Sequence, residues 1–216
     1  ANGYVSNFKV YNLGIELNDK DRYTYEKLHD GFNKYFKWFD FNFQAAMKCL
    51  QSQEYRQHYA AKTGYDVNGI MAAAVQWSKN MRNRKTFLYN HPSKFLAAKE
   101  LIDTFDVPTI TFSETVKFAN ELTKTLQPWA VSYHSKMKPY AKQMAIENFK
   151  DPKSDIKVIS TARALDEGFD IQGVSMAIVC SGTSTSRQDL QRTGRAIRWA
   201  PGKTGLMINL YITDTQ

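Results

Sequence analysis

From Thr86 to Ile212, short runs of β-branched, aliphatic and aromatic residues alternate with longer amphipathic stretches. Short runs of this kind are typical of buried strands, and the amphipathic stretches are typical of helices. The predicted strands cover residues 109–112, 129–133, 156–160, 176–180 and 205–212. The predicted helices cover residues 93–105, 114–126, 138–149 and 186–197. Strands that alternate with helices form right-handed crossovers, so this order predicts an α/β fold with a mostly parallel sheet and helices on both faces.

The first third of the chain follows a different pattern. Residues 8–17 alternate loosely and predict a strand, and Asn18 is suited to cap a following helix. Residues 19–35 and 38–81 have helical periodicity, with a turn predicted at the two glycines within 63–69. The sequence therefore predicts three parts, which are a leading strand of the α/β lobe at 1–18, a helical appendage at 19–84 and the α/β domain at 85–216.

The charge balance favours a polyanionic partner. Lysine and arginine together number 29 against 21 aspartates and glutamates, which leaves a formal net charge of +8. Such an excess is expected of a domain that associates with nucleic acid, although it says nothing about the fold. No apolar run approaches the roughly 18 residues that cross a bilayer, so no membrane association is expected.

Neither metal binding nor a disulfide framework is indicated. The two cysteines, Cys49 and Cys180, have no CxxC spacing, and the four histidines form no HExxH pair. No resident metal is therefore expected in this chain, and a reducing compartment fits best. The chain begins at Ala1 without a basic and apolar leader, so we expect a piece of a longer protein that is cytoplasmic, or nuclear or nucleoid-associated.

The residues with the most specific chemistry lie in the octet 191–198, which has the form QxxGRxxR. If this segment is helical, Arg195 and Arg198 share one face and both guanidinium groups converge on one anion. A guanidinium group is planar, permanently charged and rich in donors, which suits phosphate oxygens whose charge shifts during phosphoryl transfer. The alternative is a solvated basic helix end, which the helix dipole favours.

The octet resembles motif VI of superfamily 2 helicases, and other motifs of that family precede it in order. Residues 160–170 look like motif V, residues 110–115 are similar to motif IV, and residues 133–135 resemble a Tyr-His-Ser signature. The resemblance covers about residues 86–212. It implies the C-terminal, RecA-like half of a helicase or translocase motor.

The resemblance also implies roles for individual residues. Arg195 and Arg198 would be arginine fingers that act on ATP, with Gln191 sensing the γ-phosphate, and Gly168 and Asp170 would lie near the nucleotide. The residues expected to contact nucleic-acid phosphates are Ser113, Thr115, Ser135, Lys136, Thr161 and Arg163. They lie at strand ends, where hydroxyl groups and the free N–H groups of helix N-termini bind phosphate. The alternative for the motif IV and Tyr-His-Ser turns is that they are ordinary helix caps.

Two further features resemble functional sites but lack a residue that such a site requires. Residues 202–204 read Gly-Lys-Thr, but the phosphate-loop pattern GxxxxGK[ST] requires glycine where the chain has Ile197. We therefore expect ATP and Mg²⁺ to bind against an N-terminal RecA-like lobe that holds the metal, and this chain alone to be inactive. His134 has no carboxylate partner identifiable in the sequence, so it is interpreted as a loop histidine that contacts backbone rather than as a general base.

The motif V segment favours particular branches of the family. Glu167 precedes the glycine where DEAD-box RNA helicases usually carry arginine, and Gln172 stands where proline is common. The sequence looks more like the DNA-repair, restriction-motor and phage-type branches, so single-stranded or duplex DNA is the expected partner, ahead of RNA. The main hypothesis is an ATP-dependent helicase. The alternatives are a translocase on double-stranded DNA, a non-catalytic module that binds nucleic acid or a partner protein, and an unrelated basic α/β domain.

Overall fold

The computed structural model describes residues 8–162, 173–181 and 205–215. The chain forms two compact units, of which one contains residues 1–16 and 89–216 and the other contains residues 17–88. We call them the sheet unit and the helical unit. In the described residues no helix has both the length and the apolar character needed to cross a lipid bilayer.

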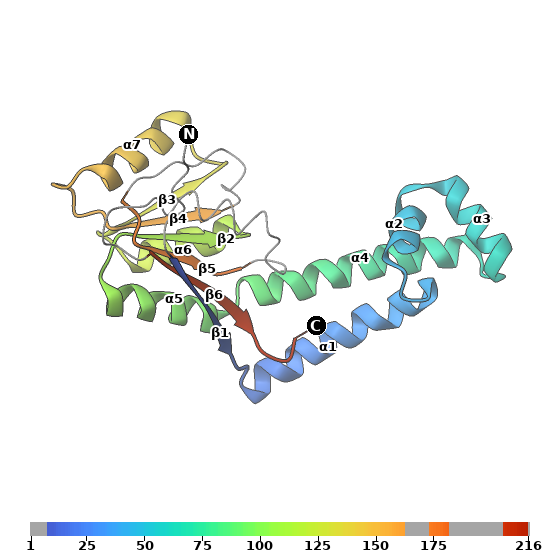
Figure 1. The fold of residues 1–216 in the computed structure, drawn as a ribbon. Coiled ribbons are helices and arrows are strands. Elements are labelled where there is room, and N and C mark those ends of the chain that lie inside the picture. The colour runs from blue at the N-terminus through green and yellow to red at the C-terminus, as the bar shows by residue number, and fades with distance from the viewer. Residues whose placement is uncertain (1–7, 163–172, 182–204, 216) are drawn as a thin grey trace. The chain divides into compact units, whose positions relative to one another are not determined.

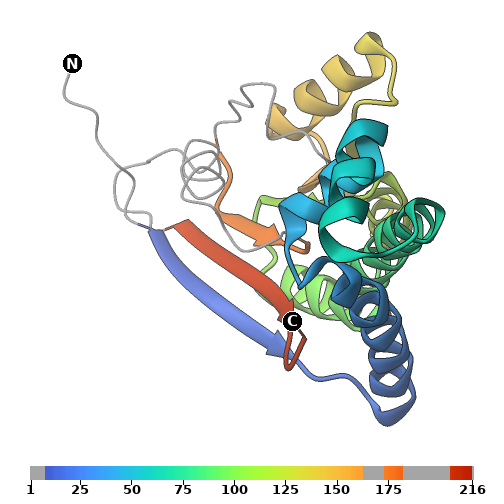
Figure 2. The ribbon, with the colours of Figure 1, turned by 90° about the vertical axis from the view of Figure 1, so that its right-hand side faces the viewer.

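The sheet unit is built on one six-stranded parallel sheet in the order β1-β6-β5-β2-β4-β3 (Figure 1). The strands are β1 (Phe8–Ile15), β2 (Thr109–Ser113), β3 (Ala130–His134), β4 (Val158–Ala162), β5 (Met176–Val179) and β6 (Gly205–Ile212). The first and last strands of the chain, β1 and β6, pair along their full length at one edge (Figure 2). The predicted leading strand therefore belongs to the same sheet as the later strands.

Strand β4 lies two residues later in the chain than the sequence predicts. Ile156 donates its backbone N–H to Ser154 Oγ at 3.1 Å, and this local turn keeps the segment before Val158 out of the sheet. At the other end, Thr161 and Ala162 continue the strand because both pair with β2 and β3. The shift matters for function because it moves Thr161 from the predicted turn into the sheet.

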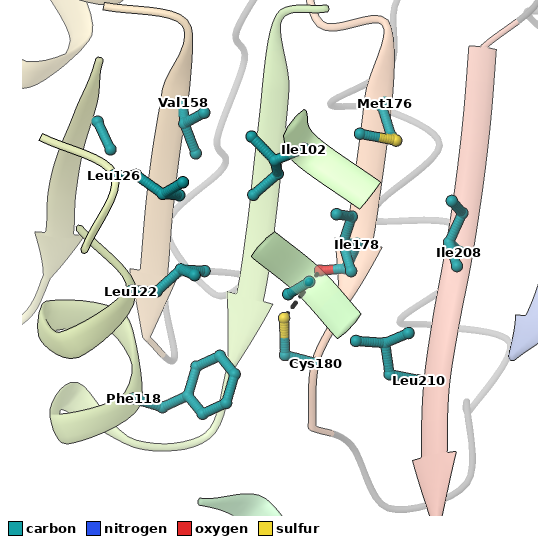
Figure 3. Close-up of a cluster of buried hydrophobic side chains, with 12 residues drawn as sticks. Ile102, Phe118, Leu122, Leu126, Val158, Met176, Ile178, Cys180, Ile208 and Leu210 are labelled. Atoms are coloured by element: carbon teal, nitrogen blue, oxygen red, sulfur yellow. Dashed lines mark hydrogen bonds between the residues drawn. The ribbon is translucent and has the colours of Figure 1, made fainter. Parts of the chain in front are cut away.

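Helices cover both faces of the sheet. In the described residues they are α5 (Pro92–Phe105), α6 (Val116–Thr125) and α7 (Pro139–Lys150), and the helix predicted at 186–197 lies outside the part that the structure describes. On one face, Ile102 of α5 and Leu122 of α6 pack with Ile178 of β5 in a buried cluster (Figure 3). On the other face, Phe149 of α7 packs in a second cluster with Ile159 of β4. The central strands are buried on both faces, as expected for a parallel sheet, and the predicted α/β class is confirmed.

The helical unit contains α1 (Asp19–Phe36), the 3₁₀ helix η1 (Lys37–Phe39), α2 (Phe43–Gln51), α3 (Gln53–Thr63) and α4 (Val67–Tyr89), the last residue of which belongs to the sheet unit. Asparagine or serine side chains cap α1, α2 and α3. The two long helices are joined by Asn80 Nδ2, which donates to the Gly31 carbonyl at 3.0 Å. The core is strongly aromatic and has the fully buried Trp77 at its centre. The predicted helical segment near the N-terminus is therefore present.

Candidate nucleotide and nucleic-acid site

The candidate site lies at the carboxyl edge of the parallel sheet, where β2 ends at Ser113, β3 at His134, β4 at Ala162 and β5 at Val179. The register places Ser113 and His134 opposite Ala162, so these ends meet. Ligands of open α/β folds bind at this edge because the turns there present polar groups and helix N-termini. The turns that carry the predicted motifs IV and Tyr-His-Ser are therefore brought together, and the segments with motifs V and VI follow β4 and β5 from the same edge.

The turn after β2 is tied to both neighbouring strands. Ser113 is buried, and its hydroxyl is within 2.8 Å of the Thr161 carbonyl and 3.2 Å of the Thr115 carbonyl. The backbone N–H of Glu114 donates to Ser181 Oγ at 2.8 Å, just beyond the end of β5. The Ser113 hydroxyl therefore has intramolecular partners, and its side chain fixes the position of the turn.

Thr115 is the N-cap of α6. Its Oγ1 accepts a hydrogen bond from the Phe118 N–H at 3.1 Å and also bonds the side chain of Asn90. This is the helix-cap geometry that the sequence offered as the alternative for this turn. The predicted contact between Thr115 and a nucleic-acid phosphate stays a prediction.

Thr161 does not lie in a turn, in contrast to the sequence-based expectation. It is fully buried inside β4, and its hydroxyl donates to the Thr111 carbonyl of β2 at 2.8 Å. The adjacent Ser160 and Thr111 hydroxyls are 3.0 Å apart. In this conformation the Thr161 side chain is inaccessible to a phosphate, because the strand extends two residues beyond its predicted end.

The turn after β3 is open to solvent. Ser135 and Lys136 are both exposed, and the turn is closed by the Met137 N–H, which donates to the His134 carbonyl at 3.1 Å. Of the predicted phosphate contacts that the structure describes, these are the two whose side chains are free to meet a ligand. A serine hydroxyl followed by a lysine ammonium group is a suitable pair for a backbone phosphate.

His134 itself is buried and links β3 to α6 through its Nε2, which is 3.0 Å from Asn120 Oδ1. Burial, together with the positive charges of Lys136 and Lys142, lowers the pKa of His134 below its usual value. The partner is thus a side chain and not the backbone that the sequence interpretation named. A neutral, hydrogen-bonded histidine in this place positions the strand end.

A buried polar pair near the same edge was not predicted from the sequence. Lys94, in the first turn of α5, is only 5% exposed, and burial lowers its pKa to about 8. It interacts electrostatically with Cys180, which is fully buried directly after β5 and whose pKa burial raises to about 12. Periodicity could have found Lys94, because it lies four and eight residues before the buried Ala98 and Ile102 on one helix face.

The remaining predicted site residues lie outside the part of the chain that the structure describes. They are Arg163, Gly168, Asp170, Gln191, Arg195 and Arg198. Their roles stay predictions. Among the described residues there is also no group of three or more His, Cys, Asp or Glu side chains that could hold a metal ion.

The fold and the motif order together define a class of protein. The sequence pattern of the family described as helicase conserved C-terminal domain matches residues 93–200, which is half of the chain. The chain therefore belongs to this family and is a helicase C-terminal domain. Membership of a helicase family implies the use of ATP and Mg²⁺, binding to nucleic acid and pairing with a second lobe.

Two relatives show how the chain compares with whole proteins. The DNA 3'-5' translocase XPB2 of Sulfurisphaera tokodaii is 25% identical over 216 residues, which is all of this chain and 45% of that protein. The ATP-dependent RNA helicase mak5 of Neosartorya fischeri is 33% identical over 101 residues, which is 44% of this chain and 13% of mak5. The chain thus spans less than half of the length of either relative.

Solved structures with the same fold also align along nearly the whole chain. The C-terminal part of the Fun30 ATPase domain has a TM-score of 0.63 at 13% identity and covers 98% of this chain and 87% of that one. The Hef helicase domain of Pyrococcus furiosus has a TM-score of 0.67 at 13% identity and covers 98% of this chain and 57% of that one. At this identity the likeness concerns the fold alone, and it confirms the predicted RecA-like architecture with its helical segment.

Proposed function

We propose that this chain is the C-terminal motor lobe of an ATP-dependent helicase or translocase that acts on DNA in preference to RNA. The observation that carries the proposal is the carboxyl edge of the sheet, where the ends of β2, β3, β4 and β5 meet and from which the motif V and motif VI segments follow. The preference for DNA is supported by Glu167 in motif V. A DNA translocase that aligns along all 216 residues supports it as well.

The ATP-directed part of the proposal rests on the residues of motifs V and VI. ATP and Mg²⁺ would be held by an N-terminal lobe and closed off by this one, with Gly168 and Asp170 beside the nucleotide. Arg195 and Arg198 would stabilise the charge that develops on the transferring phosphate, and Gln191 would sense the γ-phosphate. An arginine finger of this kind contributes about 10³ to 10⁵ in rate.

The nucleic-acid part of the proposal assigns different roles to exposed and buried residues. Ser135 and Lys136 are exposed at the edge and would contact backbone phosphates, followed by Arg163 directly after β4. Ser113, Thr115 and Thr161 hydrogen bond within the lobe, so they would act by holding the turns in place. Contacts of this kind go to phosphates and read no bases, so binding should be independent of sequence and weakened by salt.

The proposal is tested by comparing ATP turnover of the full-length protein with that of the 216-residue chain, each with and without single-stranded DNA. We expect turnover only from the full-length protein, and stimulation of that turnover by DNA. Hydrolysis by this chain alone would contradict the proposal, because it would require a phosphate loop that the chain lacks. A full-length protein that ignores nucleic acid would contradict it as well.

A translocase on double-stranded DNA is the second candidate, and a relative that aligns along the whole chain is named a DNA 3'-5' translocase. The two candidates share the same motifs and differ in whether the strands separate. Displacement of one strand from a forked duplex would identify a helicase. Displacement of a third strand from a triplex, without unwinding of the fork, would identify a translocase.

A further inference from the structure

The helical unit is unusually rich in aromatic and basic residues. Residues 17–88 are one third of the chain but contain 14 of its 29 aromatic residues, together with 12 lysines and arginines against seven aspartates and glutamates. Most of the aromatic rings form the core around Trp77. Four rings are instead strongly exposed, and these belong to Tyr23, Phe41, Phe43 and Tyr65.

Two of the exposed rings lie in the segment 40–43, which begins at a turn, ends at the first residue of α2 and is called the aromatic turn below. Asp40 and Phe41 both have left-handed backbone conformations, with φ of 49° and 56°. Glycine and asparagine adopt this conformation most easily, and a bulky residue there is a rare outlier. Phe41 is nevertheless 55% exposed, so burial of its side chain does not explain why phenylalanine stands there.

The aromatic turn is held in place by backbone hydrogen bonds. Asp40 N–H donates to the Lys37 carbonyl at 3.2 Å, Phe41 N–H to the Phe36 carbonyl at 3.3 Å, and Asn42 N–H to the Phe39 carbonyl at 2.8 Å. Asn42 also begins α2 as its N-cap. The strained conformation is therefore fixed by its surroundings, as it is at many ligand sites.

The exposed rings of Phe41 and Phe43 each contact a ring of the aromatic core. Phe41 makes an edge contact with Phe36 at a centroid distance of 5.5 Å and an interplanar angle of 82°. Phe43 makes a similar contact with Trp77 at 5.4 Å and 70°. Phe36 and Trp77 stack on each other at 5.6 Å, so both exposed rings rest on one aromatic cluster. An anchored ring loses little conformational entropy when a ligand covers it.

We propose that the aromatic turn binds single-stranded nucleic acid by stacking Phe41 and Phe43 on unpaired bases. Stacking on aromatic side chains tolerates any base sequence, and it requires bases that are not already stacked within a duplex. The positive charge of the helical unit, including the exposed Lys37 beside the turn, attracts the phosphates of such a strand. The choice of ligand rests on the proposed nucleic-acid motor, whereas the existence of the rigid, exposed turn does not.

The test measures the affinity of the 216-residue chain for a labelled oligothymidylate and for a duplex of equal length, by fluorescence anisotropy. Loss of both rings in Phe41→Ala/Phe43→Ala should weaken single-strand binding by about fivefold to 150-fold for each base that loses its stacking partner. Duplex binding should change little. The matched control is Tyr23→Ala, because Tyr23 is 59% exposed on the same unit and its ring is already covered by Lys27 Nζ at 4.4 Å.

Two further variants separate stacking from folding. Phe41→Asn places a residue that favours the left-handed conformation at this position, so it should fold at least as well as the parent chain and still bind the single strand more weakly. Phe41→Trp should retain the affinity. An oligonucleotide carrying 5-iododeoxyuridine should photo-crosslink to the peptide that contains residues 40–43.

The outcomes distinguish this inference from the proposed function. The inference would be overturned if Phe41→Ala/Phe43→Ala bound the single strand as tightly as Tyr23→Ala does. It would also be overturned if the double variant lost the binding of a protein partner while its oligonucleotide binding was unchanged. Neither result would affect a DNA-stimulated ATP turnover of the full-length protein. A chain that binds neither oligonucleotide would overturn the inference whatever the turnover.

Discussion

The two units differ in what they bury. Of the eleven buried polar or charged residues in the described chain, ten belong to the sheet unit, and Ser78 alone belongs to the helical unit. Burying a polar group costs free energy unless it is hydrogen bonded, and six of the ten in the sheet unit lie in β2, β3 and β4. The helical unit instead buries aromatic rings and leaves some of them exposed. The difference indicates that the interior of the sheet unit includes hydrogen-bonded polar groups, whereas aromatic packing dominates the interior of the helical unit.

The largest effect is expected from the aromatic core of the helical unit. Trp77 is fully buried and contacts the rings of Phe32, Phe36 and Phe39. Trp77→Ala should lower the free energy of unfolding of this unit by about 3–5 kcal/mol, because it leaves a large cavity. Hydrogen exchange should show loss of protection in α1, α2 and α4. Unchanged protection there would show that the rings do not form the core of this unit.

Replacement of the buried lysine of the sheet unit should have a smaller effect on the free energy of unfolding, and of opposite sign. Lys94 has an ordinary pKa of 10.5 and a pKa of about 8 in the folded chain, so folding penalises its charged form. The penalty is complete below about pH 8 and disappears as the pH rises to 10.5, because the unfolded chain then binds more protons than the folded one. Lys94→Met should therefore be more stable than the parent chain at pH 7, by about 3 kcal/mol.

The measurement for Lys94 is urea unfolding of both chains between pH 7 and 10.5. The difference in stability should shrink as the pH rises, and Cys180 should contribute little to the difference because it is present in both chains. A difference in stability that stays constant across this pH range would show that folding does not lower the pKa of Lys94.

The smallest effect concerns hydroxyl groups at the edge of the sheet. Thr161→Val removes the hydrogen bond to the Thr111 carbonyl without changing the shape of the side chain, and should cost about 1–2 kcal/mol of stability. Its affinity for DNA should be unchanged.

Lys136→Ala should leave stability unchanged. In a plot of the logarithm of DNA affinity against the logarithm of salt concentration, it should reduce the slope by about one. Weaker DNA binding by Thr161→Val with unchanged stability would instead support the phosphate contact that the sequence predicted for Thr161.

The sequence predicted most of the architecture because local pattern and fold agree in the sheet unit. Strand β6 is a largely apolar run that follows turn residues, and it was predicted with the bounds observed. The predicted end of β4 was wrong because Thr161 and Ala162 pair with β2 and β3, which are distant in the sequence. A local sequence pattern does not reveal such pairing. The position of Lys94 on the buried face of α5 agrees with the helical periodicity, but a lysine at such a position is usually exposed.

The aromatic turn lay beyond the reach of the sequence for a different reason. Phenylalanine is not a residue that marks a left-handed turn, and the conformation of Phe41 follows from the hydrogen bonds of η1 and the cap of α2 together. The roles of the motif VI residues, in contrast, rest on residue spacing and family resemblance, and they stay predictions.

The central claim, that this lobe supplies arginine fingers to an ATP site, is tested most directly by Arg198→Ala in the full-length protein. Lys150→Ala, at the end of α7 in the sheet unit, removes an exposed side chain of the same charge and serves as the control. We predict that DNA-stimulated ATP turnover falls by about 10³-fold or more in Arg198→Ala, with ATP affinity nearly intact, and is retained in Lys150→Ala. Turnover by Arg198→Ala equal to that of the parent protein would contradict the account.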